Sequence, residues 1–145
     1  MSASEQTLGE IMRTQFVTLK PDERLDLADD VMKLGRIRHM PVLEGTQLAG
    51  IVSQRDLLAA SLSRALEFEV PHRRSFLRSV SAQEVMARDV VTATPETSLG
   101  EAARIMIRRK IGCLPVLDAE KALVGLVTET DLLRAAYAPG DENDD

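Results

Sequence analysis

One pattern occurs twice along the chain, and this duplication constrains the fold more than any other feature. Residues 7–44 align with residues 81–118 without a gap, and residues 48–58 align with residues 123–133. Of these 49 paired positions, 18 carry the same residue, whereas chance would give about three at ordinary composition. Two copies of one structural unit are therefore expected to form most of the 145 residues.

Both copies end with the same local sequence motif. An apolar run with a central glycine is followed by a small hydroxyl residue and, three residues later, by a carboxylate. The two pairs are Ser53 with Asp56 and Thr128 with Asp131. A buried strand that leads directly into a helix fits this pattern, because hydroxyl residues favour the N-cap and carboxylates favour the first helical turn. We call each pair a corner.

The remaining patterns of the two copies predict the same elements in the same order. The capping-box form at Thr7 and at Ser81 predicts short helices over 7–12 and 81–86. Apolar residues at helical spacing predict amphipathic helices around residues 25–32 and 99–106. The expected strands are 16–19, 40–43 and 48–52 in the first copy and 90–93, 114–117 and 123–127 in the second. Each unit is thus β-α-β-β-α, preceded by a short helix, in a mixed α/β fold.

The two ends of the chain and the linker between the copies lack the repeated pattern. Pro71 to Ser75 is a polar stretch without apolar period, which predicts a break in the linker. The expected organisation is a first repeat with a short N-terminal tail over residues 1–60, a linker over 61–80, a second repeat over 81–137 and a disordered acidic tail over 138–145.

Composition excludes several classes of protein. A net charge of -5 and 3% aromatic residues argue against a nucleic-acid partner. No apolar run approaches the length of a membrane span, so no membrane partner is expected. The single Cys113 fits a reducing compartment, and the N-terminus lacks a signal-peptide pattern, so we expect a cytoplasmic protein.

The chain resembles a pair of CBS domains, also called a Bateman module, in three features. These are the order of its elements, the hairpin strands Met-Pro-Val-Leu and Leu-Pro-Val-Leu, and the corner motif that ends each copy. The resemblance covers about residues 7–60 and 81–137, nearly all of the chain expected to be ordered. It implies two repeats related by a pseudo-twofold axis, with two clefts that bind adenosine ligands such as AMP, ADP, ATP or S-adenosylmethionine. We therefore expect a stand-alone sensor that signals to an unidentified protein partner.

The resemblance also implies the residues of each cleft, which combine the corner of one repeat with residues of the other. One cleft would use Ser53 and Asp56 with Thr94, Ile111, Gly112 and Cys113, and Arg55 could add charge to it. The second cleft would use Thr128 and Asp131 with Lys20, Ile37, Arg38 and His39. Lys20 departs from the hydroxyl common at its position in the family. The basic residues of the second cleft predict a preference for phosphorylated ligands.

Two alternatives remain open at this point. The corner residues could act only as helix caps, and the chain could be a structural dimerisation module whose clefts bind nothing. A homodimer is expected in either case, because the amphipathic helices carry more apolar residues than one core can bury. The surplus residues are Leu27, Leu34 and Ile107. No nucleophile–base pair, catalytic residue or metal-ligand spacing is present, so neither an enzyme nor a required cofactor is expected.

Overall fold

Each of the two predicted hairpins lies in a separate unit of the chain. The structure is a computed structural model, which describes residues 6–65 and 73–140. One unit spans residues 17–90, and the other combines residues 1–16 with residues 91–145. The N-terminal segment therefore belongs to the same unit as the second repeat.

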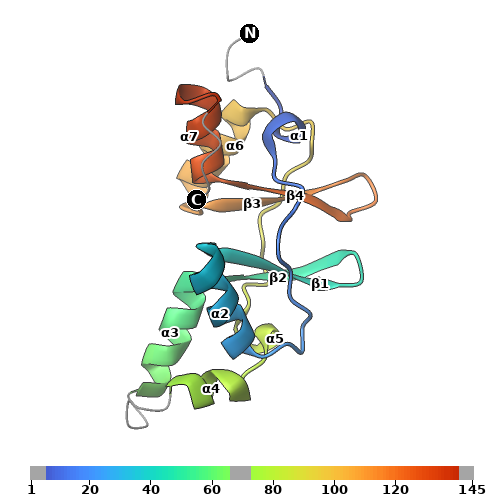
Figure 1. Ribbon diagram of the computed structural model, residues 1–145. Coiled ribbons are helices and arrows are strands. Elements are labelled where there is room, and N and C mark those ends of the chain that lie inside the picture. Colours follow the sequence, from blue (N-terminus) through green and yellow to red (C-terminus); the bar gives the residue numbers. More distant parts are fainter. Residues whose placement is uncertain (1–5, 66–72, 141–145) are drawn as a thin grey trace. The chain divides into compact units, whose positions relative to one another are not determined.

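The unit over residues 17–90 holds most of the blue, teal and green elements of Figure 1. Its elements are α2 (Leu25–Gly35), β1 (His39–Glu44), β2 (Gln47–Ser53), α3 (Gln54–Ala65), α4 (Arg73–Ser79) and α5 (Ala82–Val85). The other unit holds α1 (Leu8–Ile11), α6 (Leu99–Arg109), β3 (Cys113–Leu117), β4 (Leu123–Thr128) and α7 (Glu129–Tyr137). Both are mixed α/β, as the repeat predicted.

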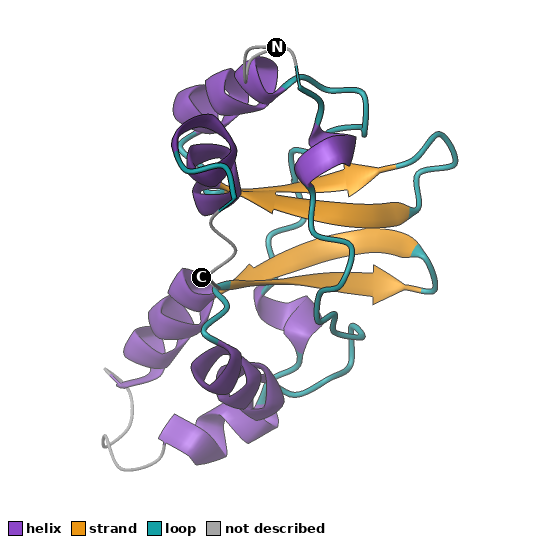
Figure 2. Ribbon diagram, turned by 45° about the horizontal axis from the view of Figure 1, so that its top comes forward, coloured by secondary structure: helices purple, strands orange, loops and turns teal. Residues whose placement is uncertain are grey.

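Each hairpin is a two-stranded antiparallel sheet, drawn in orange in Figure 2. The register places His39 opposite Ser53 in one sheet and Cys113 opposite Thr128 in the other. The prolines of β1 and β3 lie opposite Ile51 and Leu126, and each sheet changes register two residues later. The predicted hairpins, and the helices that follow them, are confirmed.

The first predicted strand of each copy is wrong as a strand. Within residues 16–19 and 90–93, only Leu19 and Ala93 form ladder contacts, and each is a single parallel bridge, to Val42 and to Val116. A proline follows two residues after each bridge, at positions 21 and 95, and ends the extended segment before a second pair can form.

The short helices α1 and α5 explain why the units cross the repeat boundaries. Arg13, just after α1, pairs with Leu126 of β4, and Ala87, just after α5, pairs with Ile51 of β2. Gly125 of β4 leaves room for this docking, because a Cβ atom there would displace the Met12 side chain. A Cβ at Gly50 would likewise lie 2.6 Å from Met86 Sδ. Each sequence copy thus supplies the short helix of the unit that holds the other hairpin.

The amphipathic helices bury the faces that their spacing predicted. Leu25, Ala28 and Met32 are buried on α2, and Leu99, Ala102 and Met106 are buried on α6. Each set belongs to the separate apolar core of its unit. Removing a buried leucine side chain from such a core costs about 2–5 kcal/mol.

The linker contains a helix where a polar break was predicted. Residues 73–79 form α4, on which Leu77 is 1% exposed. Arg74 makes a two-pronged ion pair with Asp30 of α2, at 2.8 and 2.9 Å, and Arg78 lies 3.6 Å from Asp26. The break is therefore wrong for residues 73–75, whereas Pro71 and His72 lie outside the described residues. Of the tail predicted to be disordered over residues 138–145, residues 141–145 also lie outside them, as do the first five residues of the N-terminal tail.

Candidate functional site

Each unit carries one corner at the point where a strand ends and a helix begins. In the unit over residues 17–90, the backbone N–H of Ser53 donates to Asp56 Oδ2 at 2.9 Å. The backbone N–H of Asp56 in turn donates to Ser53 Oγ at 3.0 Å. These reciprocal contacts satisfy the N–H of Ser53, which precedes α3, and the N–H of Asp56 in the first turn, neither of which has a partner within the helix.

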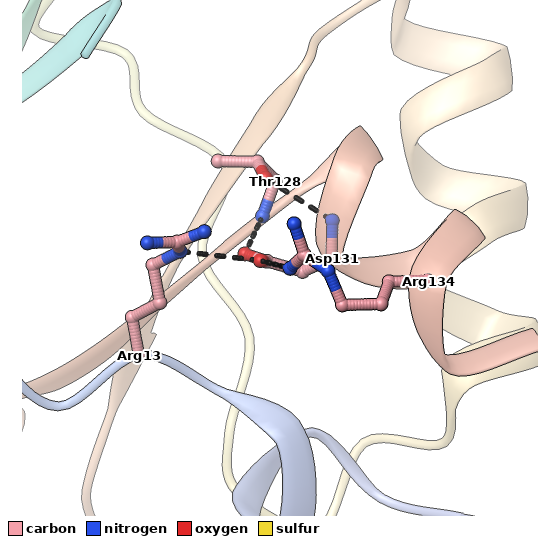
Figure 3. A network of polar contacts seen from close by, with 4 residues as sticks. All are labelled: Arg13, Thr128, Asp131 and Arg134. Atoms are coloured by element: carbon pink, nitrogen blue, oxygen red, sulfur yellow. Dashed lines mark hydrogen bonds and ion pairs between the residues drawn. The ribbon is translucent and has the colours of Figure 1, made fainter. Parts of the chain in front are cut away.

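The second corner has the same cap and a further set of contacts. The backbone N–H of Thr128 donates to Asp131 Oδ2 at 2.9 Å, and that of Asp131 donates to Thr128 Oγ1 at 3.3 Å. Asp131 Oδ1 also accepts from Arg13 Nε and from Arg134 Nη1, both at 3.2 Å. Figure 3 shows the two arginines converging on this carboxylate from the segment after α1 and from α7. Asp131 is buried, with 5% of its surface exposed.

The residues at the start of each hairpin lie beside the corner of their own unit. Gln54 N–H donates to the Arg38 carbonyl at 2.8 Å, and His39 pairs with Ser53. In the other unit, Glu129 N–H donates to the Gly112 carbonyl at 3.1 Å, and Cys113 pairs with Thr128. The structure thus brings Arg38 and His39 to one corner and Gly112 and Cys113 to the other.

Ile37 and Ile111 are positioned by the ends of α2 and α6. Arg36 and Lys110 adopt left-handed backbone angles (φ of 54° and 56°), which turn the chain out of each helix. The N–H groups of Ile37 and Ile111 then donate to the carbonyls of helix residues five positions earlier, at 3.3 and 3.1 Å. Both isoleucines are partly buried against the core of their own unit.

Three further predicted site residues are exposed. Arg55 lies in the first turn of α3, one residue before Asp56. Lys20 and Thr94 begin equivalent turns, where their backbone N–H groups donate to the side chains of Glu23 (3.3 Å) and Thr97 (3.1 Å). Which residues of one repeat complete the corner of the other stays a prediction.

Cys113 is a buried thiol beside the second corner. Burial raises the pKa of this thiol from 9.0 to about 12, and the nearby Asp131 carboxylate acts in the same direction. The thiol is therefore neutral near pH 7 and has the weak nucleophilicity of a protonated cysteine. Cys113 therefore behaves as a small apolar side chain.

Arg13 and Arg134 were not predicted as site residues. Arg134 had a readable signal, because it follows Asp131 by three positions on a predicted helix. Arg13 had none, because its place beside Asp131 depends on the docking of residues 7–13 against β4. Among the described residues, no three His, Cys, Asp or Glu side chains form a group that could hold a metal ion. No helix in the described part of the chain has the length and apolar character needed to cross a membrane.

Comparison with protein families places the two repeats in a known class. The model of the CBS domain matches residues 8–63 and again residues 82–138. The chain belongs to the CBS domain family. Both copies match, so it is a tandem CBS pair, as the corner motifs indicated.

Several similar proteins align with nearly the whole CBS pair. A CBS domain-containing protein of Dictyostelium discoideum is 33% identical over 125 residues, which is 86% of each chain. The crystal structure of a putative acetoin utilization protein (AcuB) from Vibrio cholerae is 37% identical, with a TM-score of 0.75 over 90% of this chain and 89% of that one. The structure of CBSX2 in complex with AMP is 28% identical, with a TM-score of 0.75 over 90% of this chain and 96% of that one. Two further curated relatives are longer, and this CBS pair spans 23% and 46% of their lengths.

Proposed function

We propose that this CBS pair is a regulatory module that binds an adenine nucleotide or a related adenosyl ligand: AMP, ADP, ATP or S-adenosylmethionine. The ligand binds at the corners. The residues predicted from the sequence for each cleft, which come from the other repeat, complete its binding site. The module catalyses no reaction, and its ligand state acts on a partner protein.

The observation that carries this proposal is the Ser53–Asp56 corner. The cap uses Asp56 Oδ2, and the Asp56 side chain forms no other hydrogen bond or ion pair among the described residues. A carboxylate has about four acceptor positions, so this half-buried side chain keeps capacity for the two hydroxyls of a ribose. The AMP complex of the similar CBSX2 supports a ligand that contains such a ribose.

Signalling follows from differential binding. A ligand that prefers one arrangement of the two repeats shifts the population toward that arrangement by the ratio of its two affinities. The proposal therefore needs no covalent chemistry, and its output is a change of shape that a partner recognises.

Calorimetric titration with AMP, ATP and S-adenosylmethionine tests the proposal. We expect at least one of the three to bind the wild-type protein, and we expect Asp56→Asn to weaken it roughly tenfold to a hundredfold, because a charged acceptor of two hydroxyls becomes neutral. Asp89→Asn is the matched control, since Asp89 is an exposed carboxylate of the same unit and its removal should leave affinity unchanged. Failure of all three compounds to bind wild-type protein would contradict the proposal.

Exposed apolar side chains favour a second function, that of a dimerisation module. Leu27 and Leu34 of α2 are 46% and 88% exposed, and Ile107 of α6 is 75% exposed. The predicted excess of apolar surface on these helices is thus confirmed. Association of two copies through this surface would bury it, and we propose a homodimer on this ground.

A further inference from the structure

The two corners share a cap and differ in what else binds the carboxylate. Asp131 Oδ2 accepts the backbone N–H of Thr128 at 2.9 Å, and Oδ1 accepts from Arg13 and Arg134 at 3.2 Å each. Its side chain is only 4% exposed. Within the described part of the chain, Asp56 forms no ion pair, and its side chain takes part only in the cap with Ser53.

Two substitutions between the sequence copies account for this difference. The position equivalent to Arg13, 74 residues later, is Ala87, and the position equivalent to Arg134, 75 residues earlier, is Ala59. Ala87 pairs with β2 through its backbone as Arg13 pairs with β4. The backbone frame of the two corners is therefore repeated, while the side chains that approach the carboxylate are not.

We propose that Arg13 and Arg134 determine which corner accepts a ribose: they close the Thr128–Asp131 corner to a vicinal diol and leave the diol to the Ser53–Asp56 corner. The inference rests on the proposed function and refines it. A diol at Asp131 would have to displace two guanidinium–carboxylate ion pairs on Oδ1, in which both partners are charged, with hydroxyl donors that carry no charge. It would also have to reach a side chain with almost no exposed surface.

The two corners then differ in whether they bind the diol of a ribose, and not only in their charge. The arginines remain cations when they hold Asp131, so the corner can still attract the phosphate of a ligand whose ribose is bound elsewhere. The sequence-based expectation that the Asp131 cleft prefers phosphorylated ligands is compatible with this division. Selectivity for the diol would belong to Asp56.

The test uses adenosine, which has the diol and lacks a phosphate that the arginines could bind. We expect calorimetry to give one adenosine site per chain in the wild-type protein. The Arg13→Met, Arg134→Met variant should give two, because methionine keeps an apolar stem and removes the guanidinium. Arg104→Met, Arg108→Met removes two exposed cations from α6 and should keep one site. 2′,3′-Dideoxyadenosine should lose at least tenfold in affinity at every site that adenosine occupies.

Further variants assign the sites and guard against loss of folding. In the double-arginine variant, Asp131→Asn should remove the new site, and Asp56→Asn should remove the original one. Each single arginine variant leaves Asp131 one arginine partner, and we expect the second site there with affinity at least tenfold weaker than in the double variant. Thermal melting shows which variants remain folded, and the single variants decide the question if the double variant unfolds.

The outcomes separate this inference from the proposed function. Two equivalent adenosine sites in the wild-type protein, or no additional site in any folded arginine variant, would overturn the inference while leaving nucleotide binding in place. Absence of any adenosine-type binding to wild-type protein would instead overturn the proposed function. In that case, the appearance of one site in the double-arginine variant would still support the closing role of the arginines, and its non-appearance would refute it.

Discussion

Replacing each corner aspartate by asparagine should lower the free energy of unfolding by a different amount at each corner, in the absence of ligand. Asparagine keeps the size of the side chain and one acceptor, so each variant weakens the cap by about 0.5–1 kcal/mol. For Asp56→Asn this is the whole expected loss, because its described contacts are those of the cap.

Asp131→Asn also weakens two ion pairs. The side chains of Arg13 and Arg134 are 34% and 22% exposed, so solvent screens each pair. We assign each pair about 0.5–1 kcal/mol, the upper part of the range for exposed ion pairs, because the Asp131 side of each pair is buried. Together with the cap, Asp131→Asn should cost about 1.5–3 kcal/mol, about three times the cost of Asp56→Asn.

Urea denaturation followed by circular dichroism measures both losses. A double-mutant cycle of Asp131→Asn with Arg13→Met should give a coupling free energy of about 0.5–1 kcal/mol, and the same cycle with Arg104→Met should give none. Equal losses for the two aspartate variants, or no coupling to Arg13, would show that the arginine contacts do not stabilise the second corner and would refute the reasoning.

Three other outcomes are expected. Wild-type protein should sediment as a dimer at micromolar concentration, and Leu34→Glu should sediment as a folded monomer, because Leu34 is 88% exposed; a monomeric wild type would contradict this. Since the pKa of Cys113 is raised to about 12, an aromatic disulfide reagent at pH 8 should label it far more slowly in the native protein than in urea. Hydrogen bonds from Arg74 lower the pKa of Asp30 below 3.8, so this ion pair stabilises the fold above that value and is lost as pH falls through the lowered pKa. Arg74→Met should then be less sensitive to a change from pH 7 to pH 3 in urea denaturation.

Local patterns were sufficient for the corners and the hairpins. The capping contacts of Ser53 and Thr128 involve residues three positions apart, and the hairpin strands are joined by short turns. Such contacts depend on sequence spacing alone, so a repeated spacing repeats the structure. The same holds for the buried faces of α2 and α6.

Contacts between distant segments could not be predicted in this way. The pattern at residues 7–12 predicted a helix correctly, but nothing local indicates that Met12 packs against Gly125. Helix α4 carries a partial signal in Phe76 and Leu77, yet its charge contacts lie on α2, more than 40 residues away. The predicted capping box at Thr7 also fails, since its hydroxyl lies 3.4 Å from the Glu10 carboxylate and makes no contact to the helix backbone.

The arginine pair shows how such distant contacts can divide one duplicated site into two kinds. Identical aspartates at positions 56 and 131 and similar caps give both corners the same local geometry. A carboxylate that two arginines hold contributes more to stability and has less acceptor capacity for a ligand. A carboxylate without them stabilises the fold less and keeps that capacity, which is the usual opposition between stability and binding. If this opposition operates here, the variant that opens the second corner must also be the less stable protein. Adenosine stoichiometry and urea stability should therefore change in opposite directions in the same arginine variants.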